Sequence, residues 1–317
     1  MGESAATNPT TYDLLVIGGG PAGLSAGVYG ARSGLRVAVL EQSTPGGQIA
    51  ITDEVDNYPG LPNLSGGELG MKLAEHAETL GCALVYDVAT RLSVLEDGTF
   101  SVETGMSGTL AAPAIVYAAG ATPRLAGFEG EQTYKGRGVS YCATCDGMFY
   151  RGKDVYVVGG GTAACEEALF LARIARSVTM LVRRDVLRTT PKLREQIEGS
   201  DAIDLRYNTR IKAVSGEMML KSITLENTQT GELQTVEHDG PFGVFVFVGH
   251  DPAVDLVRDY VDVAPNGIVT DAFMATKTPG LFVAGDVRDT VLRQVVTATS
   301  DGAIAATSAL KYLESRA

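Results

Sequence analysis

The sequence has 317 residues, 45% of them hydrophobic and 20% charged, which is enough for two domains with sizeable cores. Its net charge of −12 argues against nucleic acid or an anionic membrane as the main partner, because the long-range field repels phosphate. The longest apolar runs, such as Val244 to Val248, are far too short to span a bilayer. The first ten residues lack the basic start and apolar core of a secretory signal, so we expect a cytoplasmic protein.

The chain begins with a pattern typical of a βαβ unit. An apolar run is followed by a glycine-rich turn, a helical segment and a second apolar run, at 12–17, 18–23, 24–32 and 37–40. Gly18 permits the tight bend, Gly20 lets backbone N–H groups approach a pyrophosphate, and Gly23 lets helix and strand touch. Glu41 ends the second strand, where a carboxylate accepts hydrogen bonds from ribose hydroxyls and repels a 2′-phosphate. This unit therefore favours FAD or NAD over NADP.

The middle of the chain predicts connecting structure and a domain boundary. A polar loop containing Gly46-Gly47-Gln48 and Asn57-Tyr58-Pro59-Gly60 precedes a helical pattern over 66–81 and a β-like stretch over 82–102. Ala114 to Tyr117 is a buried strand that leads into Gly120 and Pro123. We predict one discontinuous domain, 1–117 with 244–317, and an inserted domain, 118–243.

Two cysteines at 142 and 145 stand in the motif Cys-Ala-Thr-Cys-Asp-Gly. Thiols three positions apart can close a small disulfide ring that opens and exchanges easily. Asp146 adds a carboxyl group that can move a proton to or from a thiolate, although a structural turn aspartate has the same pattern. The motif therefore indicates redox chemistry.

A zinc site and a purely structural disulfide are less favoured roles for the cysteine pair. A zinc site needs four soft ligands, whereas Cys82 and Cys165 are isolated in the sequence and the three histidines form no pair, so we predict no metal. A structural disulfide across so short a loop removes little unfolded-state entropy, and two unpaired cysteines suggest a reducing compartment.

A second βαβ pattern follows the cysteines. The apolar run 154–158 is succeeded by Gly159-Gly160-Gly161-Thr162-Ala163-Ala164, a helix over 165–172 and a strand over 178–182. Ala164 occupies the third glycine position, where a methyl group is still small enough for close packing. Two βαβ units imply two nucleotides and an α/β fold in which the second Rossmann-like domain is inserted into the first.

A basic cluster follows the second unit. Arg183, Arg184 and Arg188 stand where the first unit has Glu41, and guanidinium groups suit a 2′-phosphate. The second unit is thus predicted to prefer NADPH. The alternative is a solvated basic turn before the helix around 192–197.

The last third of the chain predicts the return to the first domain. Residues 203–237 alternate apolar and polar side chains, which suits antiparallel strands. Leu281 to Ala284 is a buried strand ending in Gly285-Asp286, ahead of a long helix over 294–313. Asp286 is well placed for the hydroxyls of a ribityl chain, with a turn or cap residue as the alternative. The helix start at Gln294-Val295 favours an anionic reduced flavin.

These motifs together resemble the bacterial-type, low-molecular-weight thioredoxin reductases, over nearly the whole chain from Tyr12 to Leu313. The most specific element is Cys-Ala-Thr-Cys-Asp just before the second glycine loop. It is supported by Gly46-Gly47-Gln48, Asn57 to Gly60, Gly159 to Glu167, Ala284 to Val287 and Arg293-Gln294-Val295. The resemblance implies FAD in the first domain, NADPH in the inserted one, a homodimer and a thioredoxin-like partner.

The resemblance also implies roles for single residues. Cys145 faces the flavin, Cys142 attacks the partner's disulfide, and Asp146 is the general acid. The predicted FAD-binding residues are Gly18, Gly20, Pro21, Ala22, Gly23, Glu41, Gln42, Gly47, Gln48, Asn57, Gly120, Gly285, Asp286, Arg293, Gln294 and Val295. The predicted NADPH-binding residues are Gly159, Gly161, Thr162, Ala163, Ala164, Glu166, Arg183, Arg184 and Arg188.

Two positions depart from the family pattern. Val182 replaces a histidine that is common before the arginine pair, which loosens the expected 2′-phosphate site. Met148-Phe149 stands where the family often has two phenylalanines that help to dock thioredoxin, so partner preference is open.

We expect electrons to pass from NADPH to FAD, then through Cys145 to the Cys142–Cys145 disulfide and on to a partner protein. Because nicotinamide and cysteine pair share one domain, we expect them to take turns at the flavin by rotation about linkers near Gly120 and Gly243. The rival enzymes are a flavin dithiol oxidase and a ferredoxin-fed reductase, in both of which the arginines are idle. A flavoprotein redox sensor without turnover is the rival from another class.

Overall fold

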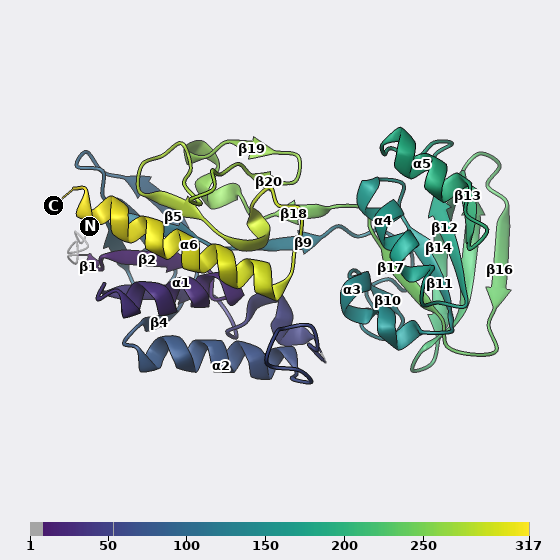
Figure 1. Cartoon of the computed structure of the whole chain (residues 1–317), viewed down its shortest axis with the longest axis horizontal. Helices are drawn as coiled ribbons and strands as arrows, with labels where there is room; N and C mark the ends of the chain where they lie inside the picture. Colours follow the sequence, from purple (N-terminus) through teal and green to yellow (C-terminus); the bar gives the residue numbers. More distant parts are fainter. Residues whose placement is uncertain (1–8, 53, 317) are drawn as a thin grey trace, which may run out of the picture. The chain divides into compact units, whose positions relative to one another are not determined.

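The computed structural model describes residues 9–52 and 54–316 (Figure 1). The prediction that the chain has no secretory signal rests largely on residues 1–8, which lie outside the described part. The chain divides into two compact units, the first comprising residues up to Thr122 and from Asp251 onward, the second Pro123–His250. Each unit contains its own five-stranded parallel sheet.

The predicted boundaries need correction at both ends of the inserted domain. The unit boundaries follow Thr122 and His250, whereas the sequence placed them after 117 and 243. The larger error concerns β17 (Gly243–Val246), assigned to the first domain, because this strand pairs in parallel with β10 and β11 inside the second unit. Gly243 is therefore a strand residue and no linker. The chain crosses between the units at β9 (Ala121–Pro123) and β18 (His250–Pro252), which form a two-stranded sheet.

The central sheet of the first unit has the strand order β21-β8-β2-β3-β4, and all its neighbours are parallel. Its strands are β2 (Leu14–Ile17), β3 (Val37–Glu41), β4 (Ala83–Tyr86), β8 (Ala114–Tyr117) and β21 (Leu281–Val283). The residues of β2, β3, β8 and β21 are all buried, as expected for parallel strands that are covered on both faces. The apolar runs in the sequence predicted these strands correctly.

Helices α1 (Pro21–Arg32), α2 (Gly66–Thr79) and α6 (Val295–Glu314) lie on one face of this sheet (Figure 1). They pack on alternate strand residues such as Val16, Val39 and Val116. Helices α1 and α6 approach closely, since a Cβ built on Gly302 would lie 2.0 Å from the backbone oxygen of Ala22. Small residues in both helices therefore bring their N-terminal halves side by side.

The opposite face of the sheet is covered by a second, smaller sheet with the order β1-β7-β6-β5. Its strands are β1 (Thr10–Thr11), β5 (Ala89–Val94), β6 (Phe100–Thr104) and β7 (Thr109–Ala112). Asp97 and Gly98 lie in the turn between β5 and β6, with Gly98 at a φ of 81°. A 3₁₀ helix, η3 (Asp255–Tyr260), and the hairpin of β19 (Val263–Ala264) and β20 (Gly267–Ile268) complete this part.

The sheet of the second unit has the strand order β10-β17-β11-β12-β13 and is also parallel. Its further strands are β10 (Val139–Ser140), β11 (Asp154–Val158), β12 (Ser177–Val182) and β13 (Ile203–Tyr207). Helices α4 (Thr162–Leu171) and α5 (Pro191–Glu198), with the short α3 (Ala143–Asp146), pack on one face. The second βαβ unit is thus β11, α4 and β12.

An antiparallel sheet of β14 (Thr209–Gly216), β15 (Leu220–Asn227) and β16 (Leu233–Glu237) covers the other face. The sequence predicted antiparallel strands throughout 203–237, and this was wrong for its first part. Residues 203–207 form β13, which pairs in parallel with β12 at the edge of the main sheet. Alternation alone does not distinguish an edge strand of a parallel sheet from a strand of an antiparallel one.

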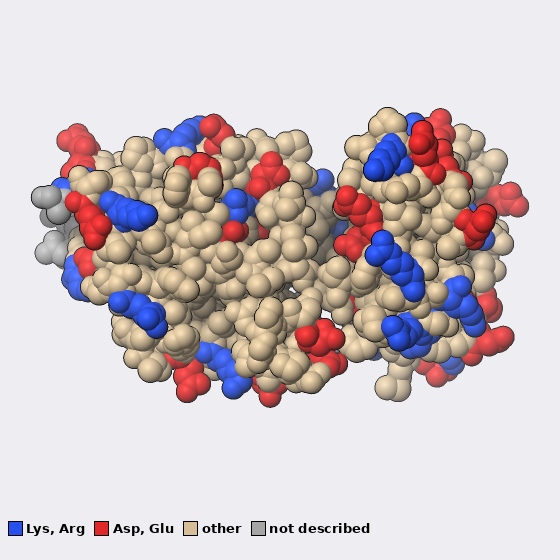
Figure 2. Space-filling model, in the orientation of Figure 1, with Lys and Arg blue, Asp and Glu red and all other residues tan. Residues whose placement is uncertain are grey.

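Surface charges of both signs are interspersed on the face drawn in Figure 2. Among the described residues, no helix has both the length and the apolar character needed to cross a membrane.

Candidate active site

Cys142 and Cys145 form a disulfide at the start of α3, with their Cα atoms 5.3 Å apart. Cys142 is the N-cap residue of this helix, and the backbone N–H of Cys145 donates to Cys142 Sγ at 3.2 Å. Donors at a helix start favour a thiolate over a thiol. The local structure is therefore suited to make Cys142 a nucleophile once the disulfide is reduced.

The other cysteines have no part in this chemistry. Cys82 and Cys165 are both buried and free. Burial raises the pKa of Cys82 to about 12 and that of Cys165 to about 11, so both stay protonated thiols at neutral pH.

Asp146 lies next to the disulfide and is held by Ser140, a residue that the sequence motifs did not indicate. The Ser140 hydroxyl donates to Asp146 Oδ2 at 2.5 Å and accepts the backbone N–H of Cys142 at 3.1 Å. Ser140 is buried at the end of β10. A single hydroxyl thus joins the proposed acid to the first cysteine, and its position in an ordinary Val-Ser-Tyr run gave no signal of this.

The first glycine turn connects β2 to α1 in the first unit. A Cβ on Gly18 would lie 2.4 Å from the backbone oxygen of Ala118, and one on Gly23 would lie 1.7 Å from the backbone oxygen of Gly18. A Cβ on Gly20 would meet no atom within 4 Å. Two of the glycines are therefore required for packing, and Gly20 borders open space at the N-terminus of α1, beside Pro21 and Ala22.

The acid of this unit is part of the same turn. Glu41 is buried, and its two carboxylate oxygens accept the backbone N–H groups of Gly19 at 2.6 Å and Ser43 at 2.8 Å. Oε1 also accepts the Ser43 hydroxyl at 3.1 Å, whereas within the described residues Oε2 accepts the Gly19 N–H alone. A carboxylate oxygen has two lone pairs, so Oε2 still has capacity for a ribose hydroxyl. The neighbouring Gln42 is exposed.

The loop after β3 is brought back to the glycine turn. Its Gly46 N–H donates to the backbone oxygen of Gly19 at 2.8 Å, and a Cβ on Gly47 would lie 3.2 Å from the Cα of Gly20. Gly47 begins η1 (Gly47–Ile51), in which Gln48 is exposed. The predicted residues of this loop therefore lie at the border of the open space in front of α1.

Two predicted residues from distant parts of the chain meet near the start of α6. Asn57 Nδ2 donates to Gln294 Oε1 at 3.0 Å, across 237 positions of sequence. Gln294 is the N-cap of α6, and Val295 packs with Val55 and Leu69 in a small apolar cluster. Gly120, also predicted, has a φ of 72° in the loop that leaves β8.

Asp286 lies in the 3₁₀ turn η4 (Gly285–Val287) after β21. Within the described residues its carboxylate receives no hydrogen bond, and the Arg293 Nε donates to its backbone oxygen at 3.3 Å. Burial, partly offset by Arg293 and reinforced by Asp301, raises the pKa of Asp286 to about 6. The Asp286 carboxylate is shielded from solvent, and no described residue donates to it. This carboxylate and the open space at Gly20 both fit a flavin nucleotide.

The second glycine turn repeats this arrangement between β11 and α4. A Cβ on Gly159 would lie 2.4 Å from the backbone oxygen of Phe247, whereas one on Gly161 would meet no atom within 4 Å. Ala164 is buried, while Thr162, Ala163 and Glu166 are exposed in the first turns of α4. Gly161 thus borders open space at a helix N-terminus, as Gly20 does in the first unit.

The basic cluster lies beside this second turn. The backbone N–H of Arg188 donates to the backbone oxygen of Gly160 at 2.7 Å, and Arg188 forms an isolated β-bridge with Gly161. The side chains of Arg183, Arg184 and Arg188 are exposed, and within the described residues none of these guanidinium groups makes an ion pair. Exposed cations beside the open space at Gly161 fit an anionic nucleotide. Val182 is buried against Gly160 and adds no polar group.

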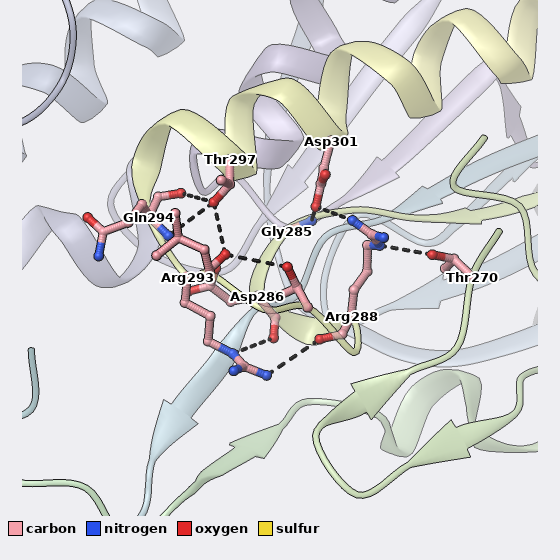
Figure 3. Close-up of polar contacts among 10 residues, drawn as sticks. Thr270, Gly285, Asp286, Arg288, Arg293, Gln294, Thr297 and Asp301 are labelled. Atoms are coloured by element: carbon pink, nitrogen blue, oxygen red, sulfur yellow. Dashed lines mark hydrogen bonds and ion pairs between the residues drawn. The ribbon is translucent and has the colours of Figure 1, made fainter. Parts of the chain in front are cut away.

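The predicted residues thus form groups within the units. The cysteines, Asp146 and the second glycine turn belong to the second unit, and the residues predicted for FAD belong to the first. A further group that the sequence motifs did not indicate is the ion pair of Arg288 and Asp301, next to the turn that carries Asp286 (Figure 3). The one signal in the sequence was an aspartate directly before Gly302, in a helix stretch otherwise rich in small residues.

Comparison with known proteins agrees with this arrangement. The family model for pyridine nucleotide-disulphide oxidoreductases matches residues 12–302. A thioredoxin reductase of Peptoclostridium litorale is 43% identical over 308 residues, covering 96% of this chain and 97% of that protein. One of Treponema pallidum is 42% identical over 306 residues, covering 96% and 98%.

A solved structure also resembles this chain over nearly its whole length. The thioredoxin reductase of Streptococcus pyogenes MGAS5005 is 40% identical, with a TM-score of 0.88 and coverage of 97% of this chain and 100% of that one. The chain therefore belongs to the pyridine nucleotide-disulphide oxidoreductase family and, within it, to the thioredoxin reductases.

Proposed function

We propose that this chain is an NADPH-dependent thioredoxin-disulfide reductase that binds FAD in its first unit and NADPH in its second. The observation that carries the proposal is the Cys142–Cys145 disulfide, with Asp146 adjacent, in a chain with two nucleotide-type glycine turns. FAD, when bound, supplies the electron pair that returns this disulfide to the dithiol, drawing on the nicotinamide of NADPH.

The residues of the second unit then perform the exchange with the partner. The Cys142 thiolate attacks one sulfur of the partner's disulfide, and the partner's other sulfur leaves as a thiolate that takes a proton from Asp146. Cys145 gives its proton to the Asp146 carboxylate and attacks Cys142 Sγ. The Cys142–Cys145 bond forms again, the partner's remaining sulfur leaves as a thiolate, and two electrons have passed to the partner.

The assignment of the nucleotides follows from charge. Glu41 in the first turn disfavours a 2′-phosphate, while Arg183, Arg184 and Arg188 beside the second turn favour one. In the rival enzymes, a dithiol oxidase and a ferredoxin-fed reductase, no group requires this cluster. We therefore propose NADPH as the electron source.

The partner and the assembly stay predictions. The exposed fractions of Met148 and Phe149, just after the active-site helix, are 50% and 53%, so an apolar surface is present for a thioredoxin-like protein. A homodimer and a cytoplasmic location remain predictions from the family resemblance and the composition.

The proposal is tested by purifying the protein, recording its visible spectrum, and following anaerobic flavin reduction by NADPH and by NADH. We expect a yellow protein that NADPH reduces faster, and that reduces a thioredoxin coupled to a disulfide dye. Cys145→Ser should abolish thioredoxin reduction while NADPH still reduces the flavin. A colourless protein, or a Cys145→Ser variant that retains turnover, contradicts the proposal.

The arginine assignment has a matched control. Arg183→Ala with Arg184→Ala should raise the KM for NADPH about 10-fold or more and leave that for NADH little changed, because only NADPH carries the 2′-phosphate. Arg173→Ala removes an exposed cation just after α4 and should change neither value. Equal losses with both nucleotides would contradict a 2′-phosphate site.

A further inference from the structure

An ion pair shielded from solvent supports the turn that carries Asp286. Arg288 Nη1 lies 2.7 Å from Asp301 Oδ2, and the two side chains are only 14% and 13% exposed. Asp301 comes from α6 and Arg288 from the segment just after η4, so the pair joins the helix to the turn (Figure 3). Arg288 Nε also donates to Thr270 Oγ1 at 2.9 Å.

The same carboxylate holds the backbone at the start of the turn. Gly285 N–H donates to Asp301 Oδ2 at 3.1 Å, and Gly285 has a φ of 78°, which favours glycine. A Cβ on Gly285 would lie 2.8 Å from the Cβ of Ala22 in α1. The turn therefore lies directly against the helix whose N-terminus borders the first glycine turn.

Arg293 holds the other end of the turn. Its guanidinium donates to the backbone oxygens of Asp286 at 3.3 Å, Arg288 at 3.5 Å and Asn266 at 2.6 Å. In Figure 3 the contacts of Arg293 with Asp286 and Arg288, and those of Asp301, reach the turn from two sides. The backbone on both sides of Asp286 is thus fixed, while no described residue donates to the carboxylate itself.

We propose that Asp301 and Arg288 are positioning residues that fix the Gly285–Asp286 turn, so that the Asp286 carboxylate is pre-oriented for the ribityl hydroxyls of FAD. This inference rests on the proposed function in one respect, that FAD binds in the first unit. Neither residue touches the flavin in this proposal. They act through the backbone N–H of Gly285.

An ion pair with this burial is poorly explained by stability alone. Removing two charges from water costs about as much as their attraction returns, and apolar residues often serve as well or better. The pair does hold the Asp301 carboxylate where it accepts the Gly285 N–H, at the start of the turn. The raised pKa of Asp286, to which Asp301 contributes, agrees with a carboxylate prepared for donors that come from a ligand.

The test measures FAD affinity directly, by titrating the apoprotein and following flavin fluorescence, with urea unfolding of each apoprotein in parallel. The variants are Asp301→Ala, Arg288→Met and the double variant, which leaves no unpaired charge. The control is Asp262→Asn, which breaks the exposed Lys277–Asp262 pair, 48% and 67% exposed, in the same unit.

We expect all three variants to raise the Kd for FAD about 10-fold or more, because the turn is no longer fixed in the binding geometry, and the control to stay within about 2-fold. The double variant should unfold close to wild type. Wild-type affinity in the double variant would overturn the inference, since the single losses would then reflect an uncompensated charge. A double variant that does not fold would also overturn it, by making the pair structural. A wild-type protein that binds no FAD would instead refute the proposed function.

Discussion

At the scale of single residues, the active-site helix depends on a hydroxyl that no motif includes. Ser140 contacts both Asp146 and the backbone N–H of Cys142, so it sets the geometry of the acid relative to the first cysteine. A serine of this kind acts through its neighbours, and its effect is best seen in the pH dependence of exchange.

Ser140→Ala should slow the dithiol–disulfide exchange with thioredoxin about 10-fold and move its pH profile to higher pH, because the carboxylate loses a donor that favours its charged form. Ser140→Thr keeps a hydroxyl and should restore most of the rate. Single-turnover exchange measured between about pH 5 and 9 provides the test, with flavin reduction by NADPH as the unaffected control. An unchanged profile for Ser140→Ala would contradict the positioning role.

Asp286 makes a prediction about stability. Its pKa is about 6 in the folded protein against an ordinary value of 3.8. Between about pH 4 and 6 the folded apoprotein therefore keeps a proton that the unfolded chain has released. The contribution of this carboxyl group to stability is therefore complete below about pH 4 and is lost as the pH rises through about 6. The loss amounts to at most about 3 kcal/mol.

Asp286→Asn removes this titration. The free energy of unfolding of the apoprotein, from urea curves at about pH 4, 5, 6 and 7, should shift in favour of the variant as the pH rises. A constant difference between the two proteins over this range would show that Asp286 has an ordinary pKa in the folded state.

At the scale of elements, the glycines of one turn have different roles. Gly23 is required by packing, because its Cβ would overlap the backbone oxygen of Gly18, whereas Gly20 faces open space. The same contrast holds in the second unit between Gly159 and Gly161. One motif therefore contains both structural and ligand-facing positions.

Gly20→Ala should leave the unfolding free energy of the apoprotein within about 0.5 kcal/mol of wild type, since a Cβ at this position would meet no protein atom within 4 Å. It should weaken FAD binding about 10-fold or more, because it occupies the space of the pyrophosphate. Gly23→Ala should instead destabilise the fold itself. Urea unfolding and FAD titration of both apoproteins distinguish the ligand-facing role from the packing role. Equal changes in unfolding free energy and in FAD affinity for the two variants would refute the distinction.

At the scale of the whole molecule, the inserted unit is defined by its sheet. Strand β17 lies between β10 and β11, and its residues Val244, Phe245 and Val246 are buried. A unit that ends at Gly243 lacks a central strand, so its two flanking strands lose their neighbour.

A fragment of residues 123–250 should fold and unfold cooperatively in urea, whereas 118–243 should show no cooperative transition. The control fragment 118–250 restores the strand and should behave like 123–250. Circular dichroism and urea denaturation provide the measurement. Cooperative unfolding of 118–243 would mean that β17 is dispensable to the unit.

The sequence by itself determined the features that depend on neighbouring residues. Both βαβ units, the redox motif and the basic cluster after the second unit follow from apolar runs, glycine spacing and charge within short stretches. Strands buried on both faces and tight strand-to-helix turns have local signatures because their steric requirements are local. The family resemblance rests on these same stretches.

Only the tertiary structure decided which strands share a sheet and which distant side chains meet. The sheet memberships of β17 and β13, the contact of Asn57 with Gln294, and the support of Gly285 by Asp301 all join segments that are separate in the sequence. The pattern of an apolar strand does not indicate which of the two units contains it. The position of a polar side chain in the sequence does not indicate which residue it will hydrogen-bond. Those choices are made by the packing of helices on sheets, which brings the partners within hydrogen-bond distance.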